Sequence, residues 1–144
     1  AVTEVELEST DDSDSLLSAS IAGACDLKLA GLVPRGEDGH VAYIRLEDGD
    51  VSVVADELRS SGDVQIIRDG ENDTLLDWQV TGESLLGMLV DFGANVRHTS
   101  VEGGHVSYTL EIAAESDARA LIDAVKKRFP DTWVLPNRSH SPPI

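Results

Sequence analysis

Two short segments with nearly the same sequence carry the side chains best suited to contact a ligand. Residues 39–43 read Gly-His-Val-Ala-Tyr, and residues 104–108 read Gly-His-Val-Ser-Tyr. An imidazole can exchange a proton or bind a metal near neutral pH, and a phenol can donate a hydrogen bond. The predicted ligand-binding residues are therefore His40, Tyr43, His105 and Tyr108. Two plainer interpretations stay open and are favoured by local chemistry: histidines inherited from one duplicated turn, and tyrosines half-buried on strands.

The remaining reactive side chains do not form a recognisable catalytic or metal-binding pattern. The sequence has no nucleophile elbow, no phosphate-binding glycine loop, no H-E-x-x-H and no C-x-x-C. A metal site built on His98 and His105 would need a third ligand, for which Glu102 is the nearest candidate. We therefore predict that the protein is not an enzyme and takes no metal or cofactor.

Acidic residues and a single cysteine complete the set of candidate groups. Asp11, Asp12 and Asp14 lack the oxygen-ligand spacing of a cation-binding loop, so they are expected to form a solvated loop that caps a helix. Cys25 is the only cysteine, which excludes a disulfide framework and a thiolate zinc site. Nothing around Cys25 predicts an activated thiol.

The elements that would position these residues repeat in order along the chain. Apolar alternation predicts strands, and apolar residues three or four positions apart predict helices. The first half is expected to hold strands at 3–8, 27–29, 41–46 and 64–67, with helices near 15–24 and 50–58. The second half is expected to hold strands at 74–80, 96–101, 106–112 and 132–135, with helices near 85–92 and 116–129. Each half therefore reads β-α-β-β-α-β, the ferredoxin-like order.

Internal matches suggest that the two halves arose by duplication. Ser15-Leu16-Leu17 recurs 69 residues later, and the glycine-histidine segment recurs 65 residues later. Coincidence remains open because each match is short. We predict an α+β fold of tandem ferredoxin-like (βαββαβ) repeats, residues 1–72 and 73–140, with antiparallel sheets and helices on one face. Each repeat alone is small, so the pair is expected to pack together.

Several details of this prediction can be checked residue by residue. Helix caps are expected at Ser13 or Asp14, Asp50, Thr81 and Ser116. Trp78 and Trp133 lie on predicted strands and are expected to fill core or interface volume. The first half carries Arg45 and Glu47 where the second half carries Leu110 and Ile112, so the two corresponding strand faces cannot be buried equally.

The charge balance separates this chain from nucleic-acid-binding domains. There are 27 Asp and Glu against 11 Lys and Arg, a net charge of −16. Such self-repulsion opposes compaction at low salt, whereas molar salt shortens the Debye length to roughly 3 Å. The composition predicts a protein adapted to a salt-rich cytoplasm, with an acidic mesophilic protein as the alternative. The one basic run, 126–128, falls at a predicted helix end and is expected to complement the helix dipole.

The chain reads as a cytoplasmic piece of a longer protein. No apolar stretch approaches the roughly 20 residues of a membrane span, and no basic-then-apolar leader is present. The chain opens at Ala1 without a methionine, and residues 141–144 (Ser-Pro-Pro-Ile) are expected to begin a linker.

The chain as a whole resembles the N-terminal domain of haloarchaeal bacterio-opsin activator-like (Bat-type) helix-turn-helix transcription regulators. The resemblance rests on the opening strand 2–7, on Asp-Leu-Lys-Leu-Ala-Gly-Leu-Val-Pro at 26–34, on the strand 75–80 with its tryptophan, and on the basic, proline-rich ending 136–143. In that family such a domain precedes a C-terminal helix-turn-helix, sometimes after PAS or GAF sensor domains.

The resemblance implies a regulatory region of an archaeal transcription factor. By analogy with other paired ferredoxin-like units, which associate through sheet edges or faces and offer clefts at their junctions, we expect this region to form a homodimer, to sense a small-molecule effector, or to do both. DNA would be contacted by a helix-turn-helix after Ile144, so no DNA-reading residue of the family maps onto this chain. No membrane partner is expected. The alternative is a stand-alone small-molecule-binding module similar to ACT domains.

Overall fold

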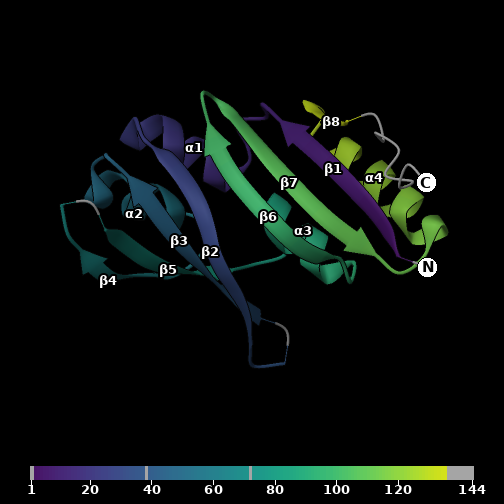
Figure 1. The fold of residues 1–144 in the computed structure, drawn as a ribbon, viewed down its shortest axis with the longest axis horizontal. Coiled ribbons are helices and arrows are strands. Elements are labelled where there is room, and N and C mark those ends of the chain that lie inside the picture. The colour runs from purple at the N-terminus through teal and green to yellow at the C-terminus, as the bar shows by residue number, and fades with distance from the viewer. Residues whose placement is uncertain (1, 38, 72, 136–144) are drawn as a thin grey trace, which may run out of the picture.

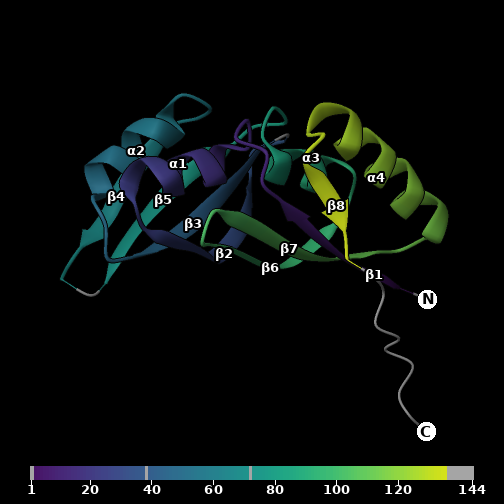
Figure 2. The same ribbon diagram turned by 90° about the horizontal axis from the view of Figure 1, so that it is seen from above.

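The computed structural model describes residues 2–37, 39–71 and 73–135, and it joins all eight strands into one antiparallel sheet. The strands are β1 Thr3–Ser9, β2 Asp26–Arg35, β3 Gly39–Glu47, β4 Val64–Asp69, β5 Thr74–Val80, β6 Asn95–Glu102, β7 His105–Ile112 and β8 Thr132–Val134. The helices are α1 Ser15–Gly23, α2 Val51–Arg59, α3 Leu85–Asp91 and α4 Glu115–Arg128. All four lie on the same side of the sheet (Figures 1 and 2). The α+β class and the order of elements are as predicted.

The strands do not pair as two separate ferredoxin-like sheets would. The sheet order is β4-β5-β3-β2-β6-β7-β1-β8. A self-contained β-α-β-β-α-β unit keeps its first strand between its own third and fourth strands. Here β5 lies between β3 and β4, while β1 lies between β7 and β8, so each half takes its first strand from the other. The predicted tandem repeat is therefore not confirmed in that form.

In each half of the sheet, the two middle strands place one large and one smaller side chain opposite each other in the core. Leu7 pairs with Tyr108 in one half, and Trp78 pairs with Ala42 in the other. All four side chains are fully buried or nearly so, so the bulky ring stands on β7 in one half and on β5 in the other. Tyr43 pairs with Asp77 and is only half-buried. Tyr43 and Tyr108, which match in sequence, therefore lie on opposite faces.

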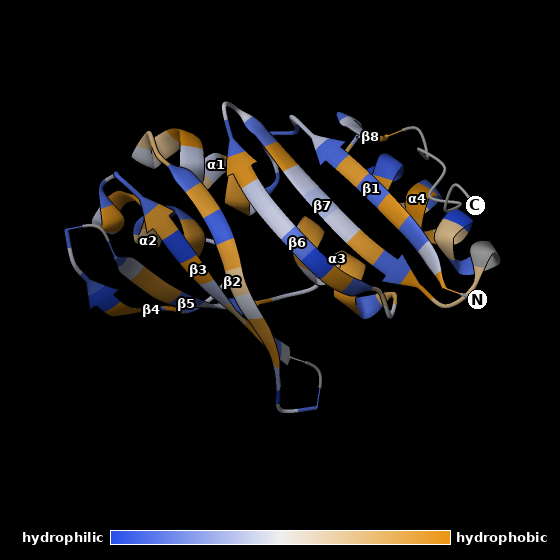
Figure 3. Ribbon diagram, viewed as in Figure 1, coloured by the Kyte–Doolittle hydropathy of each residue, from blue (hydrophilic) through white to orange (hydrophobic). Residues whose placement is uncertain are grey.

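The segments 39–43 and 104–108 match in sequence but are shifted by one residue in the sheet, because Ala42, and not Tyr43, takes the buried position that Tyr108 takes in β7. This shift explains why Arg45 and Glu47 stand where the second half carries Leu110 and Ile112. In the second part of β3, Ile44 and Leu46 are buried, which leaves Arg45 and Glu47 exposed. Figure 3 shows the resulting alternation of hydrophobic and hydrophilic residues along the sheet. The core between the sheet and the helices is built mainly of aliphatic residues, with Trp78 fully buried. Trp133, on the edge strand β8, stays 37% exposed.

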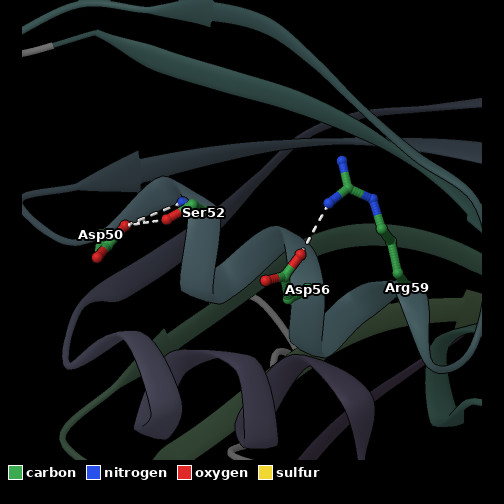
Figure 4. A network of polar contacts seen from close by, with 4 residues as sticks. All are labelled: Asp50, Ser52, Asp56 and Arg59. Carbon is green, nitrogen blue, oxygen red and sulfur yellow. Dashed lines mark hydrogen bonds and ion pairs between the residues drawn. The ribbon is translucent and has the colours of Figure 1, made fainter.

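Helix α2 begins as predicted, at an aspartate cap (Figure 4). Asp50 Oδ1 accepts hydrogen bonds from the backbone N of Ser52 at 3.1 Å and from its Oγ at 2.6 Å. Such a cap satisfies N–H groups that have no partner inside the helix. One turn later, Arg59 and Asp56 form an exposed ion pair at 2.9 Å, which adds little stability.

The other helix starts agree with the prediction in one case out of three. Asp14 caps α1, as expected. Thr81 does not cap α3; Ser84 accepts a backbone N–H of that helix at 3.0 Å, and its own hydroxyl donates to the Thr81 carbonyl. Helix α4 begins at Glu115, one residue before the predicted cap, and Ala114 stands at the cap position without a side-chain hydrogen bond.

Two large apolar residues in the regions of the predicted helices are exposed. Ile21 is 59% exposed, because α1 turns Leu16 and Leu17 toward the core. Phe92 is 42% exposed, because α3 ends at Asp91 and Phe92 lies beyond its last turn. No helix within the described residues is both long and apolar enough to cross a membrane.

Candidate functional site

The two halves of the sheet meet at a seam that is closed at one end and open at the other. Strands β2 and β6 pair at two positions, Leu27 with Val101 and Lys28 with Ser100. Beyond these pairs the strands diverge, as Figure 1 shows. Each strand has a bulge a few residues beyond the closed end, at Ala30 in β2 and at Arg97 in β6. Because a bulge bends its strand, the two bulges together hold the seam open.

A cleft of about 260 Å³ occupies the open end, and we call it the seam cleft. It is lined by Leu29, Ala30, Gly31, Leu32, Pro34, His40, Val90, Ala94, Asn95, Val96 and Arg97. One wall comes from the β2–β3 hairpin and the other from the end of α3 and the start of β6. The cleft thus lies where the two halves of the chain face each other.

Polar groups stand at the edge of the seam cleft. Arg97 Nη1 contacts Glu111 Oε2 at 3.2 Å, and the Asn95 side-chain amide donates to Glu111 Oε1 at 3.1 Å. The side chain of Arg97 remains 54% exposed. His40 lines the same cleft from β3. Of the four predicted ligand-binding residues, His40 is the one that the structure places in this cleft.

His105 lies in a different hollow on the uncovered face of the sheet. This His105 hollow has a volume of about 250 Å³ and is also lined by Glu8, Ser100, Glu102 and Ser107. The His105 ring meets the edge of the Trp133 ring, with centroids 6.2 Å apart. The two matching histidines therefore do not share a site. No cluster of three or more His, Cys, Asp or Glu side chains suited to a metal occurs among the described residues.

Tyr108 belongs to a buried hydrogen-bond pair. Its hydroxyl donates to Asp14 Oδ2 at 2.8 Å, and both side chains are completely buried. Burial and the adjacent carboxylate raise the pKa of Tyr108 well above its ordinary value. Burial raises the pKa of Asp14 to about 6, although the hydrogen bonds from Tyr108 and from the Leu16 backbone oppose the shift. This pair anchors the start of α1 to β7.

The aspartate loop is not the solvated loop that we predicted. Asp11 is 6% exposed and accepts hydrogen bonds from Ser13 and from the backbone N of Asp131. Burial alone would raise the pKa of Asp11, but these hydrogen bonds outweigh it and lower the pKa. Asp12 is the exposed aspartate of the three. The loop is buried because it passes between the two halves of the sheet. It leaves β1, which lies in the half with β7 and β8, and enters α1, which packs with α2 over the other half.

Comparison with known proteins gives this domain its context. The family described as "BAT: GAF and HTH_10 associated domain" matches residues 1–144. The chain belongs to this family. A protein of Haloferax volcanii named "Putative transcriptional regulator" is 28% identical over 128 residues, which cover 87% of this chain and 22% of that protein. No solved structure matches the chain.

The BAT domain thus has candidate residues that sequence reasoning missed. Arg97, Asn95 and the apolar walls of the seam cleft were not singled out, because no motif marks them. Cys25 is buried where α1 meets β2, and burial raises the pKa of its thiol. The linker expected at 141–144 and the proline-rich ending lie outside the described residues.

Proposed function

We propose that this BAT domain is the regulatory part of a longer transcription regulator, and that it senses a small molecule in the seam cleft. The observation that carries the proposal is the position of the cleft, between a wall from the first half of the chain and a wall from the second. A ligand that contacts both walls would favour one arrangement of the two halves over another. A ligand shifts a conformational equilibrium only if it makes different contacts in the two states. The proposal assigns no catalysis to the domain.

The family and the charge support a division of labour with a separate DNA-binding domain. The family description names an associated HTH domain, which favours a regulator over a stand-alone ACT-like module. The chain spans 22% of its Haloferax relative, so DNA contact by a helix-turn-helix elsewhere in the protein is part of the proposal. A net charge of −16 opposes contact between this domain and the phosphates of DNA. We place the regulator in a salt-rich cytoplasm, where it would reach DNA.

The basic run at the end of α4 has a structural contact that fits this division. Arg128 donates to the backbone carbonyls of Gly82 and Glu83, at 3.2 and 2.6 Å. The run also lies in the last turn of α4, where cations complement the helix dipole. These contacts tie α4 to the loop before α3.

The sensing role can be tested in cells with a variant that fills the cleft. Ala30 is exposed and sits in the bulge, so Ala30→Trp adds bulk to the seam cleft without touching the core. We expect the transcripts altered by deletion of the gene to be altered in the Ala30→Trp strain as well, by RNA sequencing at equal protein abundance. Arg45→Gln, an exposed change on β3 away from the cleft, is the control and should leave them unchanged. Wild-type transcripts with a stable Ala30→Trp protein would rule out sensing through this cleft.

We also propose that the domain forms a homodimer. The unpaired edge of β4 exposes two large apolar side chains, Ile66 at 42% and Ile67 at 46%, and such an edge can pair with another strand. Light scattering in molar KCl should give twice the 15.4 kDa chain mass. Ile66→Lys should reduce the mass to that of one chain, whereas Ile21→Lys, on α1, should not. A wild-type monomer at all accessible concentrations would contradict the dimer.

A further inference from the structure

We propose that the seam cleft binds a small organic carboxylate with an apolar body. The inference rests on the proposed sensing function and names the class of ligand. Three features of the cleft carry it: the sign of its charge, the free donors of Arg97, and its apolar walls.

The seam cleft is a region without acid in a very acidic chain. None of its eleven lining residues is Asp or Glu, although the chain has 27 of them in 144 residues. Its two titratable lining residues are Arg97 and His40. By contrast, the His105 hollow includes Glu8 and Glu102. The Glu111 carboxylate lies at the edge of the seam cleft, against Arg97 and Asn95, but does not line it. An anion inside therefore meets less repulsion than in the other hollow.

The guanidinium of Arg97 has more N–H donors than its contact with Glu111 uses, so it can also bind an anionic group. A guanidinium carries five N–H groups in a planar fork that matches a carboxylate. One hydrogen bond goes to Glu111, at 3.2 Å. Asn95 also donates to Glu111, so that carboxylate already marks the position at which an anion is held. A ligand carboxylate can share Arg97 with Glu111, which will keep the affinity modest.

The rest of the seam cleft suits a hydrocarbon body. Leu29, Leu32 and Pro34 form the wall from β2. Val90, Ala94 and Val96 form the opposite wall. The volume of about 260 Å³ lies just below the roughly 300 to 1,000 Å³ of typical ligand pockets. A single ring or a short aliphatic chain fits this size.

A buried hydroxyl lies next to the closed end of the seam. Thr99 is 4% exposed, and its Oγ1 has no hydrogen-bond partner in the structure. Thr99 is the residue before Ser100, which forms the β2–β6 pair nearest the open end. If the pairing continued by one residue, Thr99 would lie opposite Leu29. Buried polar atoms are nearly always hydrogen-bonded, but Thr99 does not line the seam cleft, so the ligand class rests on the three features above.

Benzoate and its uncharged analogue benzamide test the inference directly. Each is titrated into the ¹⁵N-labelled domain in 2 M KCl, and dissociation constants are taken from amide shifts. We expect benzoate to bind the wild type with shifts centred on 29–34 and 94–97, and to bind more tightly than benzamide. Arg97→Gln should weaken benzoate about tenfold, the value of roughly one charged hydrogen bond, without weakening benzamide. Ala30→Trp should remove both, and Arg45→Gln should change neither.

The outcomes separate the ligand class from the sensing function. Equal affinity for benzoate and benzamide, both lost in Ala30→Trp, would overturn the carboxylate inference while leaving the cleft as a ligand site. No binding of either compound, or benzoate binding unchanged by Arg97→Gln, would also overturn it. Specific benzoate binding combined with wild-type transcripts in the Ala30→Trp strain would uphold the inference and remove the sensing function.

Discussion

A peptide of residues 1–71 is expected to be unfolded, while a peptide of residues 10–80, equal in length, folds. The first peptide contains the complete β-α-β-β-α-β order, but it lacks β5, which separates β3 from β4. Its own β1 cannot pair with β7 and β8. The second peptide contains α1, α2 and the contiguous strands β4-β5-β3-β2. Of its strand pairings it loses only the two that β2 makes with β6. It also loses the hydrogen bonds that Asp14 and Asp11 accept from Tyr108 and Asp131, which lowers its stability.

Circular dichroism and urea unfolding in molar KCl distinguish the two peptides. The 10–80 peptide should show a cooperative transition of low stability, since a domain of this size buries a modest core. The 1–71 peptide should show none, and adding a peptide of residues 73–144 should restore structure. A cooperative transition in the isolated 1–71 peptide would mean that the first half forms its own sheet.

The buried aspartate at the start of α1 is expected to make stability fall as the pH rises from about 4 to about 6. The pKa of Asp14 is about 6 in the folded protein, against an ordinary value of 3.8 for an aspartate in water. The folded state therefore holds this proton more tightly than the unfolded state, and ionisation costs folding free energy. Two pKa units correspond to about 3 kcal/mol. The stabilisation that protonated Asp14 provides is complete below pH 4 and decreases as the pH rises through 6. At higher pH it does not change further.

Asp14→Asn isolates this effect, because asparagine does not ionise and is an equally good helix cap. Its one amide oxygen can accept the Leu16 N–H, and its NH2 can donate to the Tyr108 hydroxyl, so the cost of the altered hydrogen bond does not depend on pH. The other carboxylates titrate in both proteins and cancel in the difference. Relative to the variant, the wild type should lose up to about 3 kcal/mol of unfolding free energy between pH 4 and pH 7, by urea unfolding at fixed KCl. Asp12→Asn, an exposed change two residues away, should show no such trend. Parallel stability curves for the wild type and Asp14→Asn would refute this prediction.

The elements could be predicted from the sequence because they follow from local patterns. Alternation on β5 predicted its bounds, 74–80, without error. Pairing could not be predicted in the same way, since β1 and β5 present similar apolar faces and the chain order is identical with or without the exchange. The one-residue shift that buries Tyr108 and leaves Tyr43 half-buried arises from long-range register. A sequence match alone cannot reveal it.

The candidate site was only partly predictable for the same reason. His40 was chosen from a sequence match and does line the seam cleft. Arg97 was missed because its position depends on a bulge and on a strand from the other half. One signal was available: both strands of the cleft come from ten-residue stretches without Asp or Glu, 27–36 and 92–101. Without the fold, nothing places these stretches side by side.

The exchange of first strands, which makes one sheet and places the seam at its centre, is tested most directly by a NOESY spectrum of the labelled domain in molar KCl. The exchange predicts cross-strand contacts between Leu7 and Tyr108 and between Trp78 and Ala42. Two self-contained repeats would instead give contacts between Leu7 and Ala42 and between Trp78 and Tyr108, and that result would contradict the account.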